Sequence, residues 1–347
     1  MSKAIKIEAI DVFCGAGGLS YGLQQAGIKI LAGIDVDKAC QYPFETNVKA
    51  TFLQKDVRKV DAIELNSLYS PGAIKMLAGC APCQPFSSFR NKLGDNEEDE
   101  KWTLLDEFGR LVEELQPDLV TMENVPPLRS KDVFKQFVAK LESQKYSVDV
   151  QVVFCPAYGI PQQRRRLVLI ASRLGKVTPL KPLYEPADYP SVRDTIEHLP
   201  KVESGRVYVA DPLHRAVGLT DLNLKRIRHS KPGGTWKDWP EDVRSACHKK
   251  ESGASFQSVY ARMEWDKPGP TITTQCYNYG TGRFGHPEQD RAITLREAAM
   301  IQSFPDTYEF AKPALISFTG TGRLIGNAVP PKLGTAIGEH FKKHLTK

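Results

Sequence analysis

The stretch IEAIDVFCGAGGLSYGLQQAG, residues 7–27, decides the fold of this chain. It begins as an apolar, β-branched run, passes through a turn that contains Gly15, Gly17 and Gly18, and continues as a helical pattern. Glycines at such a point allow a tight turn in which the backbone comes close to a ligand at the start of a helix. Ser20 stands where the dinucleotide pattern G-x-G-x-x-G has its third glycine. The stretch therefore predicts a strand, a ligand-binding turn and a helix, without identifying a dinucleotide.

The alternation of strand and helix continues as far as Ser172. Apolar runs bounded by turn residues recur, and helical patterns separate them. Such runs predict an α/β fold with a mostly parallel sheet, helices on both faces, and ligands at the carboxyl ends of the strands. The runs are IKILAGID at 28–35, AIKMLAGC at 73–80, DLVTMEN at 118–124, SVDVQVVF at 147–154 and LVLIAS at 167–172.

The alternation of strand and helix patterns ends after Arg173, where proline, glycine and charged residues become frequent. This change predicts a second, smaller and less regular domain. Two helical patterns then follow: TLREAAMIQSF at 294–304, which Thr294 and Glu297 are placed to cap, and AVPPKLGTAIGEHFKKHL at 328–345. The predicted domains are residues 1–174 together with 291–347, and residues 175–290.

Charge and cysteine content restrict the class of protein. The formal net charge of +6 suits a polyanionic partner, although charge alone does not identify one. The seven cysteines are an odd number at scattered positions, which favours reduced thiols in an intracellular protein. No apolar run approaches the ~18 residues that a membrane span requires. We therefore expect a cytoplasmic protein that does not bind membranes.

Two acidic residues follow predicted strands. Asp35 lies twenty residues after Gly15 and is placed to accept hydrogen bonds from ribose hydroxyls. Asp56 follows TFLQK and could accept from an adenine amine. Each alone would more often be a helix cap or a loop residue. The series of glycine turn, Asp35 and Asp56 favours a nucleoside cofactor.

The stretch GCAPCQPFSSFR, residues 79–90, allows a redox pair, half of a zinc site, or one nucleophile. Zinc would require two more ligands at short spacing, and the sequence has no second close cysteine pair. A redox pair should open a helix, whereas Pro85 and a loop-like run follow here. Cys80 ends an apolar strand and is interpreted as a buried small hydrophobe. Cys83 lies beyond the strand tip and is the candidate nucleophile.

Six segments, in this order, resemble the DNA (cytosine-5)-methyltransferase family, of the bacterial restriction–modification type, over nearly the whole chain. The resemblance implies a Rossmann-like S-adenosylmethionine-dependent methyltransferase fold, with 175–290 as a target-recognition domain. It also implies an enzyme that flips a cytosine out of duplex DNA and methylates its carbon 5, with S-adenosylhomocysteine as product and no metal. The segments are VFCGAGG at 12–18, PCQPFS at 82–87, TMENVPP at 121–127, GIPQQRRRLVLIAS at 159–172, LREAAMIQSFPD at 295–306 and LIGNAVPPKLG at 324–334.

The resemblance assigns catalytic roles that the chemistry requires. Carbon 5 of cytosine becomes reactive only after a nucleophile adds at carbon 6, and Cys83 would add there as a thiolate. Glu123, in protonated form, would donate to N3. The family pattern Gln-x-Arg-x-Arg matches Gln162, Arg164 and Arg166, and an arginine can donate to cytosine O2. A phosphate clamp is the alternative interpretation of the arginine block, and we expect both roles within it. No residue is evident that removes the carbon-5 proton.

The resemblance also implies cofactor and DNA contacts. The run SSFRNKLGDNEEDE at 87–100 is a candidate lid over DNA. The segments SKPGGTWKDW at 230–239 and TTQCYNYGTGRFGHP at 273–287 are candidate DNA-facing segments, although the bases they would read do not follow from the sequence. The expected cofactor residues are Phe13, Gly15, Gly17, Asp35, Val36, Asp56, Pro82, Leu104 and Asn327, and the expected DNA contacts are Ser87, Arg90, Arg165, Trp236 and Arg283.

The expected partners are double-stranded DNA and a separately encoded restriction endonuclease, and we expect a monomer. Three alternatives remain open. The first is methylation of tRNA cytosine, which is disfavoured because no Cys-Phe-Thr tripeptide occurs within 175–290. The second is a catalytically inactive DNA-binding relative, which intact Cys83, Glu123 and Arg166 disfavour. The third is a nicotinamide oxidoreductase with a redox pair of Cys80 and Cys83.

Overall fold

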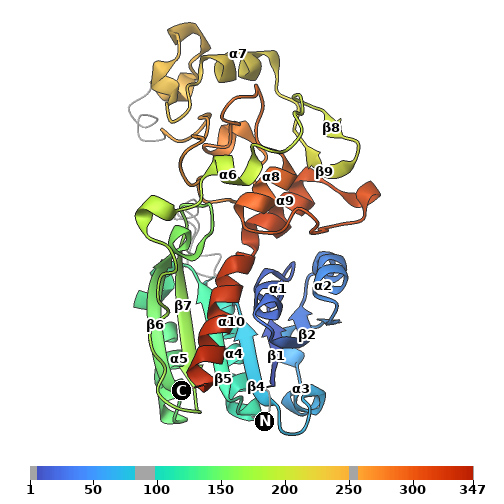
Figure 1. Cartoon of the computed structure of the whole chain (residues 1–347), viewed down its shortest axis with the longest axis vertical. Coiled ribbons are helices and arrows are strands. Elements are labelled where there is room, and N and C mark those ends of the chain that lie inside the picture. The colour runs from blue at the N-terminus through green and yellow to red at the C-terminus, as the bar shows by residue number, and fades with distance from the viewer. Residues whose placement is uncertain (1–5, 83–97, 250–256, 347) are drawn as a thin grey trace. The chain divides into compact units, whose positions relative to one another are not determined.

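A computed structural model describes residues 6–82, 98–249 and 257–346 of the chain. The chain forms two compact units, each described here by itself (Figure 1). Unit 1 comprises residues 1–158, 165–183 and 329–347. Unit 2 comprises residues 159–164 and 184–328.

Unit 1 is built on a seven-stranded sheet with the order β3-β2-β1-β4-β5-β7-β6. All neighbours are parallel except β7, which runs antiparallel to both β5 and β6. The predicted mostly parallel sheet is thus confirmed, and the order reverses direction at β1, where open sheets of this kind bind ligands. The strands are β1 (Ile7–Val12), β2 (Lys29–Asp35), β3 (Thr51–Gln54), β4 (Ile74–Gly79), β5 (Leu119–Asn124), β6 (Ser147–Phe154) and β7 (Arg165–Ser172).

Helices cover both faces of this sheet. β1 and β5 are buried at every residue, which requires packing on both faces. On one face, Phe108 of α4 and Phe137 of α5 pack with ring centroids 5.7 Å apart. They belong to a core cluster that includes side chains of the strands. The helices of unit 1 are α1 (Gly18–Gln25), α2 (Gln41–Val48), α3 (Ala62–Leu68), α4 (Glu98–Leu115), α5 (Asp132–Ser143) and α10 (Pro331–Leu345).

The C-terminal helix α10 packs against α1, as Figure 1 shows for the red helix beside the sheet. A Cβ atom on Gly22 would lie 2.0 Å from Pro331 O and 2.8 Å from Gly334 Cα. The backbones of the two helices therefore touch, and only glycine fits at this crossing. The chain was predicted to return to the first domain near its C-terminal end, and α10 is the helix that does so.

Unit 2 is less regular, with short helices and a two-stranded hairpin. The helix cap predicted from the sequence is confirmed, because Thr294 and Glu297 form a reciprocal capping box at the start of α8. Its elements are α6 (Val192–Ile196), β8 (Val207–Tyr208), β9 (Asp211–Arg215), α7 (Asp221–His229), α8 (Leu295–Ile301) and α9 (Phe318–Asn327), with 3-10 helices between them.

The unit boundaries differ from the predicted domains. Residues 291–328 belong to unit 2, and only 329–347 return to unit 1. The reason is a set of long-range contacts within unit 2. Arg296 Nε donates to Asp211 Oδ2 at 2.6 Å, and Arg291 Nε donates to Val202 O at 2.7 Å. These contacts tie α8 to the segment before α7.

Candidate active site

The glycine turn after β1 is bonded to the end of β2. Phe13, Gly15 and Gly17 have φ angles of 62°, 52° and 87°, in the left-handed region that favours glycine and strains phenylalanine. Cys14 N donates to Ile34 O at 3.1 Å, and Gly15 N donates to Asp35 Oδ2 at 2.9 Å. The turn and the end of β2 therefore form one rigid corner of unit 1.

Asp35 and Val36 present a carboxylate and an apolar side chain at this corner. Asp35 Oδ1 accepts from Asp37 N at 2.9 Å, so each carboxylate oxygen holds one backbone N–H and retains a second acceptor position. Burial raises the pKa of Asp35, and the backbone hydrogen bonds from Asp37 and Gly15 oppose that rise. The side chain of Val36 is 68% exposed. The arrangement fits the ribose and the base of a nucleoside.

Asp11 and Ser20 form a buried contact within the turn that sequence reasoning missed. Ser20 Oγ donates to Asp11 Oδ2 at 2.6 Å, and both residues are almost fully buried. Asp11 Oδ1 has no hydrogen-bond partner in the described part of the chain. Burial raises the pKa of Asp11 to about 7. Ser20 replaces the third glycine of the dinucleotide pattern. Its hydroxyl therefore stabilises the turn through the hydrogen bond to Asp11.

The other expected cofactor residues have varied surroundings. Asp56 caps a 3-10 helix (Val57–Lys59) and forms an ion pair with Arg58 at 2.6 Å, which lowers its pKa. Leu104 packs against the core cluster of unit 1, and Pro82 is exposed. Asn327 is the last residue of α9, in unit 2. Of the expected set, the described contacts bring together Gly15 and Asp35.

Glu123 is buried at the end of β5, with a side chain 3% exposed. Arg166 Nε lies 2.7 Å from Glu123 Oε1. The register explains this pair, because β5 and β7 are antiparallel and Glu123 lies opposite Val168. On the other side, the Cys80 thiol donates to Glu123 Oε2 at 3.1 Å. Glu123 and Arg166, two of the predicted catalytic residues, are thus in contact.

Cys80 has more than the predicted role of a small hydrophobe, because its thiol is bonded to Glu123. Burial raises its pKa well above the ordinary value, and the charge of Glu123 acts in the same direction. A thiolate is the reactive form in redox exchange. This environment gives no support to a redox role for Cys80.

The three consecutive arginines have three different environments. Arg164 is buried in unit 2, where its guanidinium donates to Ile272 O at 3.0 Å and to Gly326 O at 3.4 Å. Arg165 is exposed and lies over the ring of Phe154, 4.7 Å from its centroid. Arg166, in unit 1, forms an ion pair with Glu123, with Nε 2.7 Å from Oε1. The described contacts thus separate Arg166 from the other two.

Trp236 is placed differently from the DNA contact that was expected. It is 4% exposed, and its ring stacks on His248 with centroids 4.4 Å apart. It belongs to a core cluster of unit 2 with Trp239 and Tyr279. The aromatic side chains of this segment thus build a core in a unit whose described sheet has two short strands. The expected site residues Cys83, Ser87 and Arg90, with the candidate lid up to residue 97, lie outside the described residues.

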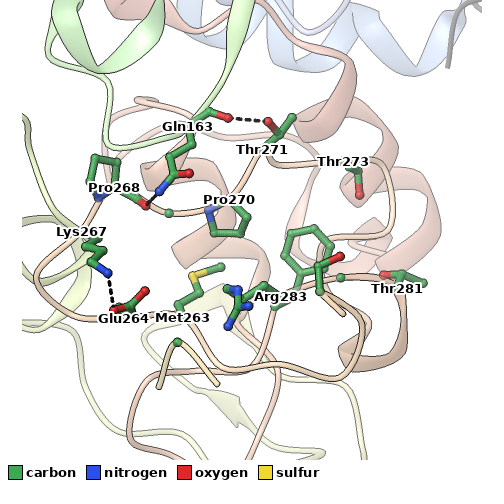
Figure 2. Close-up of a pocket in the computed structure, with 15 residues that line it drawn as sticks. Gln163, Met263, Glu264, Lys267, Pro268, Pro270, Thr271, Thr273, Thr281 and Arg283 are labelled. Atoms are coloured by element: carbon green, nitrogen blue, oxygen red, sulfur yellow. Dashed lines mark hydrogen bonds and ion pairs between the residues drawn. The ribbon is translucent and has the colours of Figure 1, made fainter. Parts of the chain in front are cut away.

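Arg283 lines a pocket of about 400 Å³ in unit 2. Its Nη1 donates to Gly234 O at 2.8 Å, and burial lowers its pKa. Figure 2 shows Met263 and Arg283 in this pocket, with the Glu264–Lys267 ion pair of 2.8 Å on one side. Both candidate DNA-facing segments contribute to its wall. They supply Gly233, Thr273, Thr281, Gly282, Arg283 and Phe284.

Among residues 6–82, 98–249 and 257–346, no three His, Cys, Asp or Glu side chains gather closely enough to hold a metal ion. None of the helices in that part of the chain combines the length and the apolar composition needed to cross a bilayer.

Comparisons with known proteins place the chain in a family. The family model for C-5 cytosine-specific DNA methylase matches residues 7–343. The Type II methylase M.HgiDII of Herpetosiphon aurantiacus is 51% identical over 97% of this chain and 95% of that protein. The Type II methyltransferase M.Eco47II of Escherichia coli is 31% identical over 97% of this chain and 79% of that protein.

Solved structures share the fold. A DNA modification methyltransferase encoded within an E. coli prophage matches with a TM-score of 0.75 at 22% identity, over 99% of this chain and 100% of that chain. The Dnmt2 methyltransferase of S. pombe matches with a TM-score of 0.68 at 16% identity, over 99% and 100% respectively. With these matches, and with the sheet order described above, the chain belongs to the C-5 cytosine-specific DNA methylase family and is a DNA (cytosine-5)-methyltransferase.

Proposed function

We propose that the chain transfers a methyl group from S-adenosylmethionine to carbon 5 of a cytosine flipped out of duplex DNA, with Cys83 as nucleophile and Glu123 as acid. The observation that carries this proposal is the buried carboxyl of Glu123, held by Arg166 at 2.7 Å and by the Cys80 thiol at 3.1 Å. It lies at the carboxyl end of β5, and β5 neighbours β4, which leads toward Cys83. Such strand ends hold the ligands in sheets of this kind.

The corner between β1 and β2 supports the choice of cofactor. The second acceptor positions of the Asp35 carboxylate suit ribose hydroxyls. Val36, exposed beside it, offers an apolar surface to the adenine, and the glycine turn lets the backbone approach the ligand. S-adenosylmethionine, when bound, would supply an electrophilic methyl group on its sulfonium. No metal is required by this chemistry.

The chain's own residues would carry the remaining steps. The thiolate of Cys83 forms a bond to carbon 6, and the displaced electron pair moves to N3, which takes a proton from the Glu123 carboxyl. Carbon 5 then bears the electron density that accepts the methyl group. Loss of the carbon-5 proton and departure of the Cys83 sulfur restore the ring, while N3 returns its proton to Glu123. Arg166 holds the Glu123 carboxyl in place and can donate to cytosine O2.

Duplex DNA is the proposed substrate. Arg165 is exposed beside the site, and Arg283 lines the pocket of unit 2, so both are proposed to contact DNA. Removing a base from the stack costs a few kcal/mol, which contacts of this kind would offset. We further propose that the enzyme acts as a monomer in the cytoplasm, and that it protects DNA against a separately encoded restriction endonuclease. The relatives named Type II methylases support that setting.

Labelled methyl transfer tests this proposal. Duplex DNA and bulk tRNA are each incubated with purified protein and labelled S-adenosylmethionine. The proposal predicts transfer to DNA and not to tRNA, and loss of transfer in the Cys83→Ser variant. Bisulfite sequencing of DNA from expressing cells would then report the methylated cytosines and their sequence context. Transfer by Cys83→Ser at the rate of the parent protein, or transfer to tRNA alone, would overturn the proposal.

A further inference from the structure

Cys80 links two parts of the proposed site. It follows β4 directly, and its backbone N–H donates to Val12 O at 3.3 Å. Its thiol donates to Glu123 Oε2 at 3.1 Å. Cys83 follows three residues later in the chain. One residue therefore joins the segment that leads to the proposed nucleophile with the carboxyl of the proposed acid.

A second bond runs beside the first. Asn124, 3% exposed, donates from Nδ2 to Ala81 O at 2.9 Å. Two consecutive residues at the end of β5 thus bind two consecutive residues after β4. Hydrogen bonds between buried groups are costly to break, because each polar group would be left without a partner. The two strand ends are therefore fixed in their spacing.

The carboxyl of Glu123 has a contact at each oxygen, an ion pair at Oε1 and a hydrogen bond at Oε2. Arg166 Nε lies 2.7 Å from Oε1, and the Cys80 sulfur lies 3.1 Å from Oε2. The terminal torsion of a glutamate is broad, so a carboxyl that is bound at one oxygen can still rotate. Contacts at both oxygens define the plane of the group. The thiol supplies the second of these contacts.

The thiol of Cys80 suits the role of a donor. Burial raises its pKa well above the ordinary value, and the charge and hydrogen bond of Glu123 do the same, against a smaller opposing effect of Arg166. The sulfur therefore keeps its proton at neutral pH. A protonated thiol donates a weak hydrogen bond and is a poor nucleophile.

We propose that Cys80 is a positioning residue for DNA methylation: its S–H holds Glu123 Oε2 so that the Glu123 carboxyl meets N3 of the cytosine while Cys83 adds to carbon 6. This inference rests on the proposed function. It goes beyond that function because it gives the first cysteine of the Cys-Ala-Pro-Cys stretch a task in the reaction that is neither nucleophilic nor redox. It also predicts that a hydroxyl can replace the thiol.

The test compares Cys80→Ala, which lacks the donor, with Cys80→Ser, which keeps one. The single-turnover rate of methyl transfer is measured with enzyme in excess over DNA, together with the affinities for DNA and S-adenosylmethionine. We expect Cys80→Ala to slow transfer roughly tenfold, the size expected for the loss of one hydrogen bond in a buried site. The affinities should stay within about twofold. Cys80→Ser should recover most of the rate.

Cys155→Ala is the matched control. Cys155 is a fully buried cysteine of unit 1 that follows β6, and β7 separates that strand from β5. Its loss should leave the single-turnover rate near that of the parent protein. If Cys80→Ala proves too unstable to assay, Cys80→Val fills a similar volume without a donor and replaces it in the comparison with Cys80→Ser.

Two results would overturn the inference. The first is a Cys80→Ala or Cys80→Val protein that transfers methyl groups as fast as the parent. The second is a Cys80→Ser protein as slow as the variant without a donor, because then the hydrogen bond is not what matters. Failure of the parent protein to methylate DNA at all would instead refute the proposed function, so the two failures are distinguishable.

Discussion

Two buried glutamate–arginine pairs in this enzyme differ in how fully their carboxyl groups are bonded. In unit 2, Arg291 donates to both oxygens of Glu297, each at 2.7 Å, and Thr294 N donates to Oε2 at 2.7 Å. In unit 1, Glu123 has one nitrogen of Arg166 at 2.7 Å and the weaker thiol donor of Cys80 at 3.1 Å. Both glutamates are at most 3% exposed.

We propose that the difference separates a structural pair from a functional one. A carboxylate that accepts from both terminal nitrogens of an arginine and from a backbone N–H has three strong hydrogen bonds, and it serves to fix the start of α8. A carboxyl with one partner per oxygen keeps positions for a ligand. A buried carboxyl that lacks some of its hydrogen bonds is costly, and such groups are found where chemistry is done. We therefore propose different roles for the same two residue types in the two units.

The largest expected effect comes from breaking the structural pair. Arg291→Met leaves the charge of Glu297 buried without its partner, and we expect a loss of about 3–5 kcal/mol in the free energy of unfolding. Chemical denaturation followed by fluorescence measures this loss. The double variant Arg291→Met with Glu297→Leu removes both charges and should recover part of the stability. A single variant as stable as the parent would contradict the structural assignment.

Acid should weaken the same pair. Burial alone would raise the pKa of Glu297, but the charge and hydrogen bonds of Arg291 lower it from 4.5 to about 2. Because the pKa is lower in the folded state, this contribution to stability is present above about pH 4.5 and is lost as the pH falls toward 2. The loss amounts to about 3 kcal/mol at most.

Urea unfolding at several pH values between 6 and 3 measures that loss. The Glu297→Gln variant is the control, since it has no carboxyl at this position and should lack this part of the acid dependence. Neighbouring His286, whose pKa burial lowers to about 4, adds to the acid sensitivity in both proteins. Equal pH dependence in parent and variant would refute the contribution of Glu297.

Breaking the functional pair should affect the reaction more than the fold. Glu123→Gln removes the proton donor but retains the size of the side chain, and we expect single-turnover methyl transfer to fall by about a hundredfold or more. The midpoint of thermal unfolding should change little, in contrast with Arg291→Met. A variant with near-normal transfer and much lower stability would show that Glu123 is structural too.

The smallest effect is expected at Arg165, which is exposed next to Arg166. Arg165→Ala should weaken DNA binding severalfold and reduce the slope of log affinity against log salt by about 0.9, as the loss of one phosphate contact does. The transfer rate at saturating DNA should remain near that of the parent, unlike that of Arg166→Ala. Binding titrations at several salt concentrations measure the slope. An unchanged slope would exclude a phosphate contact.

The sheet of unit 1 follows from sequence because its strands are continuous apolar runs. The run at 7–12 and the run at 118–124 became β1 and β5, and the reciprocal cap of Thr294 and Glu297 is local chemistry that a short pattern reveals. The antiparallel direction of β7 was not predicted, since an apolar run has no direction. It matters, because that register brings Arg166 to Glu123.

The missed features depend on contacts between distant residues. Nothing local to Cys80 indicates that its thiol meets Glu123, which is 43 positions away in the sequence. Trp236 was expected to contact DNA because it lies among basic residues, but unit 2 has no large sheet and uses its aromatic rings as a core. Ser20 was interpreted as a departure from a pattern, whereas its hydroxyl donates to Asp11 Oδ2.

The most direct measurement is covalent trapping on duplex DNA that contains 5-fluorocytosine, with S-adenosylmethionine present. The fluorine cannot leave as a proton does, so an enzyme that works through addition at carbon 6 stays attached to its substrate. The account predicts an adduct that survives denaturation, located at Cys83 by peptide mapping, and formed much more slowly by Glu123→Gln. An adduct at Cys80, or no adduct from a protein that methylates ordinary DNA, would contradict it.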